Sequence, residues 1–131
     1  MEINRLYSLA ERSGVTVDRY PLPQNGSISV KSGNKMFVAI DEHASPIMER
    51  IYLAHELGHC ETASFYNVYS PFDIREKHER RANAWAISKL IPKTLYRKAL
   101  RMGYDNVYSL AEYFSVTPEF MQKAVEYYQT A

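Results

Sequence analysis

The chain has little of what extracellular and membrane proteins require. Cys60 is the single cysteine among 131 residues, so a disulfide framework within one chain is excluded and a reducing cytosol suits the protein. The sequence has no apolar run of the roughly 20 residues that span a bilayer. Its N-terminal segment is amphipathic, unlike the apolar centre of a signal peptide. We therefore expect a cytoplasmic protein that makes no membrane contact.

The chain also lacks an excess of charge of either sign. Sixteen Lys and Arg residues stand against 15 Asp and Glu residues, which gives a formal net charge of +1. It has neither the broad basic field typical of nucleic-acid binding nor a polybasic membrane cluster. With 46% hydrophobic and 24% charged residues, the composition is that of a globular protein. The length fits one domain over residues 1–131.

The chain does contain the pattern His-Glu-x-x-His, formed by His55, Glu56 and His59. On a helix, residues four apart lie about 40° apart around the axis and one turn apart along it, so both imidazoles can reach one metal ion. Glu56 lies about 100° from His55 and would stand beside that ion. The pattern therefore predicts a zinc site with an open coordination position and a carboxylate that accepts a proton from water.

The surrounding sequence favours the helix that this spacing needs. Ser45 followed by Pro46 is typical of a helix start, and apolar residues recur at helical spacing up to about residue 61. Gly58 destabilises a helix interior by about 1 kcal/mol relative to Ala. Close approach of a neighbouring backbone would compensate for that cost. We expect that neighbour to be the helix that carries a third metal ligand.

Glu79 is the carboxylate that we select as the third ligand. It follows the motif by 20 residues, counted from His59, and falls in the next predicted helix. Two His and one Glu, with water in the fourth position, form a known catalytic zinc set. Asn83 lies one turn after Glu79, where its amide could hydrogen-bond the free ring nitrogen of a ligating histidine. We expect Zn²⁺, although Mn²⁺ and Fe²⁺ accept the same donors.

Four other side chains are weaker candidates for this site. Glu76 lies one turn before Glu79 on a similar helix face and is the rival carboxylate. His78 points about 100° away from Glu79. His43 lies in a connection and is better interpreted as a surface residue. Cys60 lies off the ligand face and fits a small buried side chain better than a ligand. Without the upstream motif, Glu79 itself would fit a solvated helix charge.

The remaining pattern predicts an α+β fold that is mostly helical, with a small antiparallel sheet near the N-terminus and a C-terminal helix bundle. An N-terminal helix and sheet occupy residues 1–44, the metal-binding helices 45–92 and the C-terminal helices 93–131. A capping box from Asp73 to Glu76 marks one helix start. The predicted helices cover about 2–13, 46–61, 73–91, 93–102, 106–115 and 118–129; the strands cover 15–20, 27–31 and 35–40; a loop covers 64–72.

The strand over 35–40 immediately precedes the motif helix. If this strand is an exposed edge, it could bind an extended peptide by strand addition. A second electrophile, often Tyr or His in such sites, would stabilise the oxyanion. With 11 tyrosines in the chain, the sequence does not identify that residue.

Two segments together carry a family resemblance. Leu-Ala-His-Glu-Leu-Gly-His occupies 53–59, and Glu-x-x-Ala-Asn-x-Trp-Ala begins at Glu79 and leads through apolar residues to Pro92. They resemble the ImmA/IrrE family of metallopeptidases, although Trp85 replaces the usual Phe and a histidine that often follows the motif is absent. The resemblance implies a zincin-like fold. It also implies metal ligands at the two motif histidines and Glu79, with Glu56 as the catalytic glutamate.

The resemblance also implies a function. Members of the family include proteases that cleave helix-turn-helix repressors of phages and mobile elements. We therefore expect a zinc-dependent endopeptidase whose substrate is such a repressor. The alternative is a non-catalytic, metal-stabilised regulatory module that binds a repressor or DNA through the C-terminal helices. The cleavage site and the oligomeric state are not indicated.

The segment from Leu110 to Val125 resembles a helix-turn-helix, so it bears on the alternative of DNA binding through the C-terminal helices. A DNA-reading helix should expose basic and amide residues. Its second helix offers Lys123 and Gln122, but Glu119 and Glu126 offset them. We therefore favour a packed helix pair that covers the metal-binding part over direct nucleic-acid binding.

Overall fold

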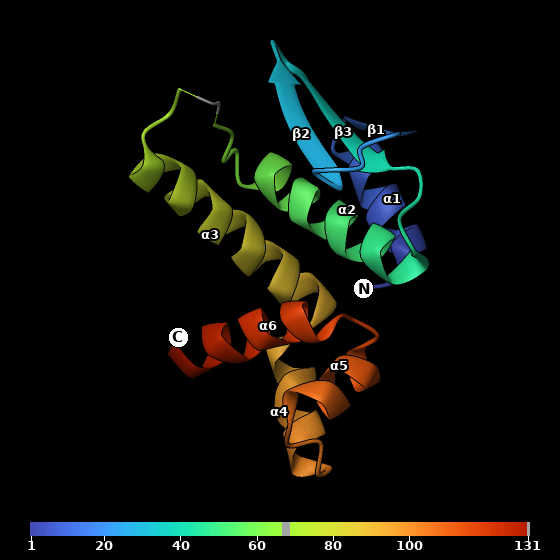
Figure 1. Cartoon of the computed structure of the whole chain (residues 1–131), viewed down its shortest axis with the longest axis vertical. Helices are drawn as coiled ribbons and strands as arrows, with labels where there is room; N and C mark the ends of the chain where they lie inside the picture. The colour runs from blue at the N-terminus through green and yellow to red at the C-terminus, as the bar shows by residue number, and fades with distance from the viewer. Residues whose placement is uncertain (67–68, 131) are drawn as a thin grey trace.

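The computed structural model describes residues 1–66 and 69–130, and within them a three-stranded sheet packs on the first two helices (Figure 1). The remaining helices extend from there to the C-terminus. The α+β prediction is confirmed. The elements are α1 (Ile3–Arg12), β1 (Val15–Tyr20), β2 (Ser27–Ser32), β3 (Lys35–Asp41), α2 (Pro46–Glu61), α3 (Phe72–Leu90), α4 (Lys93–Arg101), α5 (Val107–Phe114) and α6 (Pro118–Thr130).

The sheet is mixed, and the prediction of an antiparallel sheet is wrong in this respect. Its strand order is β1-β3-β2, with β3 antiparallel to β2 and parallel to β1. Pro21 and Pro23 follow β1 directly and remove backbone donors where a tight hairpin would need them. The connection over 21–26 is long enough to pass β3, so β2 forms on its far side and β3 enters between the two earlier strands.

This strand order also corrects the hypothesis about the peptide-binding edge. The strand over 35–40 corresponds to β3, which is paired on both sides and offers no free edge. The outer strands are β1 and β2, and β2 lies on the side of the sheet that faces α3 (Figure 1). Any peptide that extends the sheet on this side must therefore pair with β2.

The helix that carries the motif begins and ends as predicted. The Ser45 side chain accepts a hydrogen bond from the Met48 backbone N–H at 3.2 Å, and Pro46 occupies the first helical position. The motif residues lie in the last two turns, and Leu53, Ala54 and Leu57 on the same helix are fully buried. This burial fixes the rotation of α2 and thereby the direction of both histidines.

The start of α3 differs from the predicted capping box. The helix begins at Phe72, with Pro71 in the cap position and no side-chain cap hydrogen bond. Asp73 therefore lies inside the first turn, where its carboxylate faces the positive end of the helix dipole instead of capping it. The predicted loop over 64–72 overlaps this helix by one residue, and its residues 67–68 lie outside the described residues.

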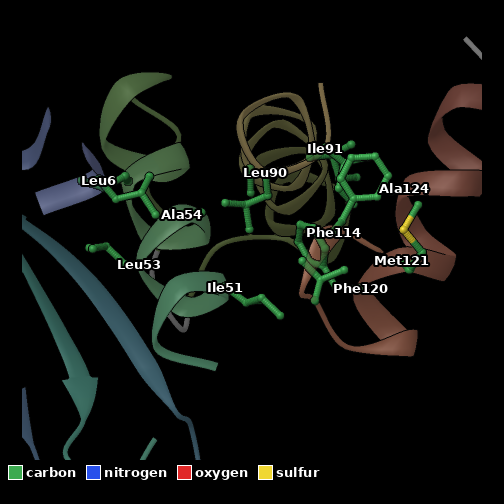
Figure 2. Packing of buried hydrophobic residues seen from close by; sticks show 14 of the residues in the cluster. Leu6, Ile51, Leu53, Ala54, Leu90, Ile91, Phe114, Phe120, Met121 and Ala124 are labelled. Carbon is green, nitrogen blue, oxygen red and sulfur yellow. The ribbon is translucent and has the colours of Figure 1, made fainter. Parts of the chain in front are cut away.

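The helices α4, α5 and α6 begin and end within one residue of their predicted limits. Asn106 caps α5 and Thr117 caps α6, each by accepting a hydrogen bond from a backbone N–H of the first turn. Buried side chains from α2 and α3 join those of α5 and α6 in one apolar cluster, which includes Ile51, Leu90, Phe114, Phe120 and Met121 (Figure 2). Across the described ranges, no helix is apolar over enough length to cross a bilayer.

Gly58 lies where α2 crosses α3. A Cβ atom on Gly58 would stand 2.5 Å from the backbone oxygen and 2.9 Å from the Cα of Ala82. Both distances are shorter than van der Waals contact allows, so only glycine permits this crossing. The predicted reason for Gly58, a closely packed neighbouring helix, is confirmed.

We expect Gly58→Ala to destabilise the protein and to weaken metal binding. Overpacking costs about 1–3 kcal/mol, which exceeds the roughly 1 kcal/mol that Ala contributes through helix propensity. The thermal midpoint and the zinc affinity from chelator competition should both fall, because the extra methyl group pushes α3 away from α2. Ser88→Ala, on an exposed position of α3, should change neither. An unchanged zinc affinity in Gly58→Ala would contradict this account.

Candidate metal centre

The crossing of α2 and α3 brings three potential metal ligands together. His55 and His59 come from α2 and Glu79 from α3. The His55 Nε2 atom lies 3.0 Å from Glu79 Oε2, and the His59 Nε2 atom lies 3.2 Å from Glu79 Oε1. One donor atom of each residue falls within 4.8 Å of the other two. The structure therefore brings together the three residues that the sequence suggested, with their donor atoms close enough to share one ion.

The opposite ring nitrogens of both histidines are held by oxygen atoms. His55 Nδ1 lies 2.9 Å from Asn83 Oδ1, and His59 Nδ1 lies 2.7 Å from the backbone oxygen of Ser64. Because a carbonyl oxygen only accepts hydrogen bonds, each Nδ1 carries the proton and each Nε2 is left to bind a cation. Asn83 thus makes the ring contact expected of it. Ser64, which the sequence did not indicate, plays the same part for the second histidine.

The electrostatics of the cluster suit a cation. Burial raises the pKa of Glu79, but hydrogen bonds from His55, His59 and Tyr66 outweigh it and leave that pKa far below its usual range. Burial lowers the pKa of His59, but its contacts with Glu79 and Ser64 outweigh burial and raise it. Glu79 is therefore ionised, and its negative charge faces two imidazole nitrogens.

These residues fit a divalent metal. Two neutral imidazoles and one carboxylate match the His, His, Glu donor set of catalytic zinc sites. The fixed Nδ1 protons supply the ring orientation that such sites require. Without a metal, a proton on each Nε2 atom supplies the hydrogen bonds to Glu79, and a divalent cation would take the place of those protons. The donor set itself also admits Mn²⁺ or Fe²⁺.

Glu56 stands beside the cluster in a pocket. Its side chain is 6% exposed, and the Ser27 hydroxyl donates a hydrogen bond to Glu56 Oε2 at 2.7 Å. The pocket has a volume of about 620 Å³ and is lined by side chains of all three ligand candidates, by Glu56, by β2 and by the first turns of α6. A buried carboxylate with one oxygen fixed and a pocket in front of it is suited to accept a proton.

Ser27 and Tyr66 are site residues that no sequence pattern indicates. Ser27 reaches Glu56 only because β2 folds over α2, and no spacing in the sequence reveals that contact. The Tyr66 hydroxyl donates to Glu79 Oε1 at 2.5 Å, and its ring stacks on His78 at 6.3 Å between centroids. Burial and then the bond to Glu79 raise the pKa of Tyr66 to about 12, so the hydroxyl remains a donor that orients the carboxylate.

The weaker candidates take other positions. Glu76 pairs with Arg80 at 3.3 Å, and His43 is exposed beside Glu42. Cys60 is buried, as expected, and burial raises the pKa of its thiol to about 12. His78 lies behind Tyr66 and outside the cluster of three.

The sequence matches the peptidase M78 family, described as an IrrE N-terminal-like domain, over residues 10–126. The chain belongs to this family. The M78 match and the His-His-Glu cluster together identify a metallopeptidase. No curated protein matches the chain. The resemblance read from residues 53–59 and 79–92 is therefore confirmed.

We expect Asn83→Ala to weaken zinc binding by this M78 domain by about 10- to 100-fold, the usual loss when a residue that orients a metal-binding histidine is removed. The amide lies 2.9 Å from His55 Nδ1, and its removal frees that ring to rotate. Chelator competition measures the affinity, and circular dichroism checks the fold. Asn4→Ala, at an exposed position on α1, is the matched control. Equal zinc affinities in the two variants would show that Asn83 does not orient His55.

Proposed function

We propose that the chain is a zinc-dependent endopeptidase. The observation that carries this proposal is a single pocket that holds the three clustered donors His55, His59 and Glu79 together with the buried carboxylate of Glu56. A site that served only to stabilise the fold would have no use for Glu56 beside the donors or for open space in front of it.

His55, His59 and Glu79 would hold the metal, which supplies Lewis acidity to polarise the scissile carbonyl and to lower the pKa of water. The chain's own residues position the reactants. Glu56 accepts a proton from water in the pocket and passes it to the leaving amine. Because Ser27 donates to one oxygen of Glu56, the carboxylate is held at a fixed rotation and the other oxygen remains available for the proton.

The substrate reaches this pocket along β2. The backbone N–H of Asp41 donates to the Gly26 oxygen at 2.7 Å, which sets the hydrogen-bond alternation of the β2–β3 ladder. In this alternation, the backbone N–H and C=O groups of Ile28 and Val30 bond to β3. The backbone N–H and C=O of Ser29 therefore point to the free edge. Ser29 also lines the pocket. An extended segment that pairs with Ser29 therefore passes in front of Glu56.

A helix-turn-helix repressor of a phage or mobile element is the proposed protein substrate, in line with the resemblance to the ImmA/IrrE family. A neighbouring repressor gene would supply the candidate. A protein substrate of this kind contains short connections between helices that can adopt the extended form that pairing with β2 requires. We propose that the enzyme acts on the repressor protein and does not bind DNA through α6. This helix buries Phe120 and Met121 in the core, and its first turns form part of the pocket wall.

Glu56→Gln should abolish cleavage while it leaves zinc content and thermal stability close to those of the wild type. Gln keeps the shape and can accept the bond from Ser27, but it accepts no proton from water. The test is co-expression with any helix-turn-helix repressor that a neighbouring gene encodes, followed by mass spectrometry of the repressor's fragments. If the two proteins produce the same fragments, Glu56 is not the base. A metal-stabilised binding module would lose nothing by this change.

Ser29→Pro should raise KM or abolish cleavage, because proline removes the N–H that pairs with substrate. Proline is tolerated at an edge position whose N–H faces solvent, so we expect the fold and the zinc content to persist. Ser29→Ala removes the hydroxyl but keeps the N–H, and it should cleave as the wild type does. Wild-type cleavage by a folded, zinc-loaded Ser29→Pro protein would refute strand addition at β2.

A further inference from the structure

The edge strand β2 has its apolar side chains on the outside. Ser27 turns toward α2, since its hydroxyl contacts Glu56. Alternation then places Ser29 on the same inner face and Ile28 and Val30 on the outer face. Ile28 is 40% and Val30 48% exposed. A strand that served only the core would bury the Ile and Val and expose the serines.

The exposed apolar face continues onto β3. Val30 pairs with Phe37 and Ile28 with Ala39, so these four side chains lie on one face of the sheet. Phe37 is 40% exposed as well. The described helices α1 and α2 pack against the sheet on the opposite face. The apolar pair Ile28 and Val30 therefore lies directly at the free edge.

Proteins usually protect a free sheet edge with proline, a bulge or charge. Here the stretch from Ser27 to Val30 has none of these, and a charge first appears at Lys31. The register with β3 is regular along all of β2. An unprotected edge beside a pocket with a metal-binding donor set indicates a strand that receives another chain.

We propose that the outer pair Ile28 and Val30 selects substrates with two apolar residues separated by one position. This inference rests on the proposed peptidase function and on pairing at Ser29. The substrate residue opposite Ser29 turns its side chain inward, over the small serines and into the pocket. Its two neighbours turn outward, next to Ile28 and Val30. The preferred substrate is an extended segment of the form apolar-any-apolar, with the middle residue at the pocket.

The inner face agrees with this assignment. Ser27 and Ser29 are small and leave room for the middle residue in the pocket, which Met48, Ile51 and Phe120 also line. Ile28 lies between the two serines and borders the pocket as well, while strand alternation turns its side chain to the outer face. The inner subsite therefore selects by space in the pocket, and the outer pair selects by apolar contact. A bound segment with polar residues at both outer positions would bring no apolar side chain against Ile28 and Val30.

The test has a binding arm that needs no cleavage. A phage library of random 12-residue peptides is selected on the zinc-loaded Glu56→Gln protein. We expect Ile, Val, Leu, Phe or Tyr to be enriched at two positions one residue apart. In the double variant Ile28→Thr and Val30→Thr, with Glu56→Gln retained, the enrichment should disappear, because Thr keeps the strand propensity but removes apolar contact.

Phe37→Thr is the matched control. It lies on the same face but one strand spacing, about 4.8 Å, farther from the edge, so β2 stands between Phe37 and a bound segment. The control should retain the enrichment and the thermal midpoint should confirm that each variant folds. A selection without the alternating pattern, or a pattern that survives in the Ile28 and Val30 double variant, overturns the inference.

The second arm uses wild-type enzyme and a library of peptides prepared from a digested cytosolic proteome. Cuts made by the wild type but not by Glu56→Gln should lie in segments of the form apolar-any-apolar. The double variant Ile28→Thr and Val30→Thr, with Glu56 intact, should raise KM about tenfold at unchanged kcat. Absence of any Glu56-dependent cut refutes the proposed function, whereas Glu56-dependent cuts without the pattern refute only the inference. Dimerisation that increases with concentration and is lost in the double variant would assign the edge to a second copy and also overturn it.

Discussion

The crossing of α2 over α3 is the contact on which the site depends. Gly58 brings the two helix backbones so close that a single methyl group would collide with Ala82. Gly58 lies directly before His59, and Ala82 lies between Glu79 and Asn83. The close approach of the two helices thus lies beside the donor residues on both helices. Helix packing sets the ligand distances, and a metal would occupy a site that the packing has already arranged.

The rest of the chain holds this crossing and closes the pocket. Arg50 on α2 donates to the backbone oxygens of Phe114 and Ser115 at the carboxyl end of α5, both at 2.6 Å. A cation at that end of a helix is favourable, because it meets the negative end of the helix dipole. The bond fixes the turn that leads into α6, whose Thr117 and Phe120 line the pocket. The C-terminal helices therefore complete the site that α2 and α3 begin.

The sequence predicted the donors because their arrangement is local. His55, Glu56 and His59 share one helix, and Glu79 and Asn83 share the next, so helical spacing alone places each set on one face. Ser27 and Tyr66 could not be found in this way. Their contacts with Glu56 and Glu79 depend on how β2 and the segment before α3 fold across α2. Pairing of strands is equally non-local, which explains why the parallel partner of β1 was not predicted.

The strand β2 shows how one element can serve the fold and the substrate together. Its inner serines contribute little apolar burial, and one of them holds Glu56. The sheet gains its stability from β3, where Val38 and Ile40 are buried against the helices. Since β3 carries the core, β2 is free to place Ile28 and Val30 outward at a cost in solubility that an edge strand normally avoids. A bound segment would cover both side chains and remove that cost, so the exposed pair makes binding along β2 more favourable than backbone pairing alone.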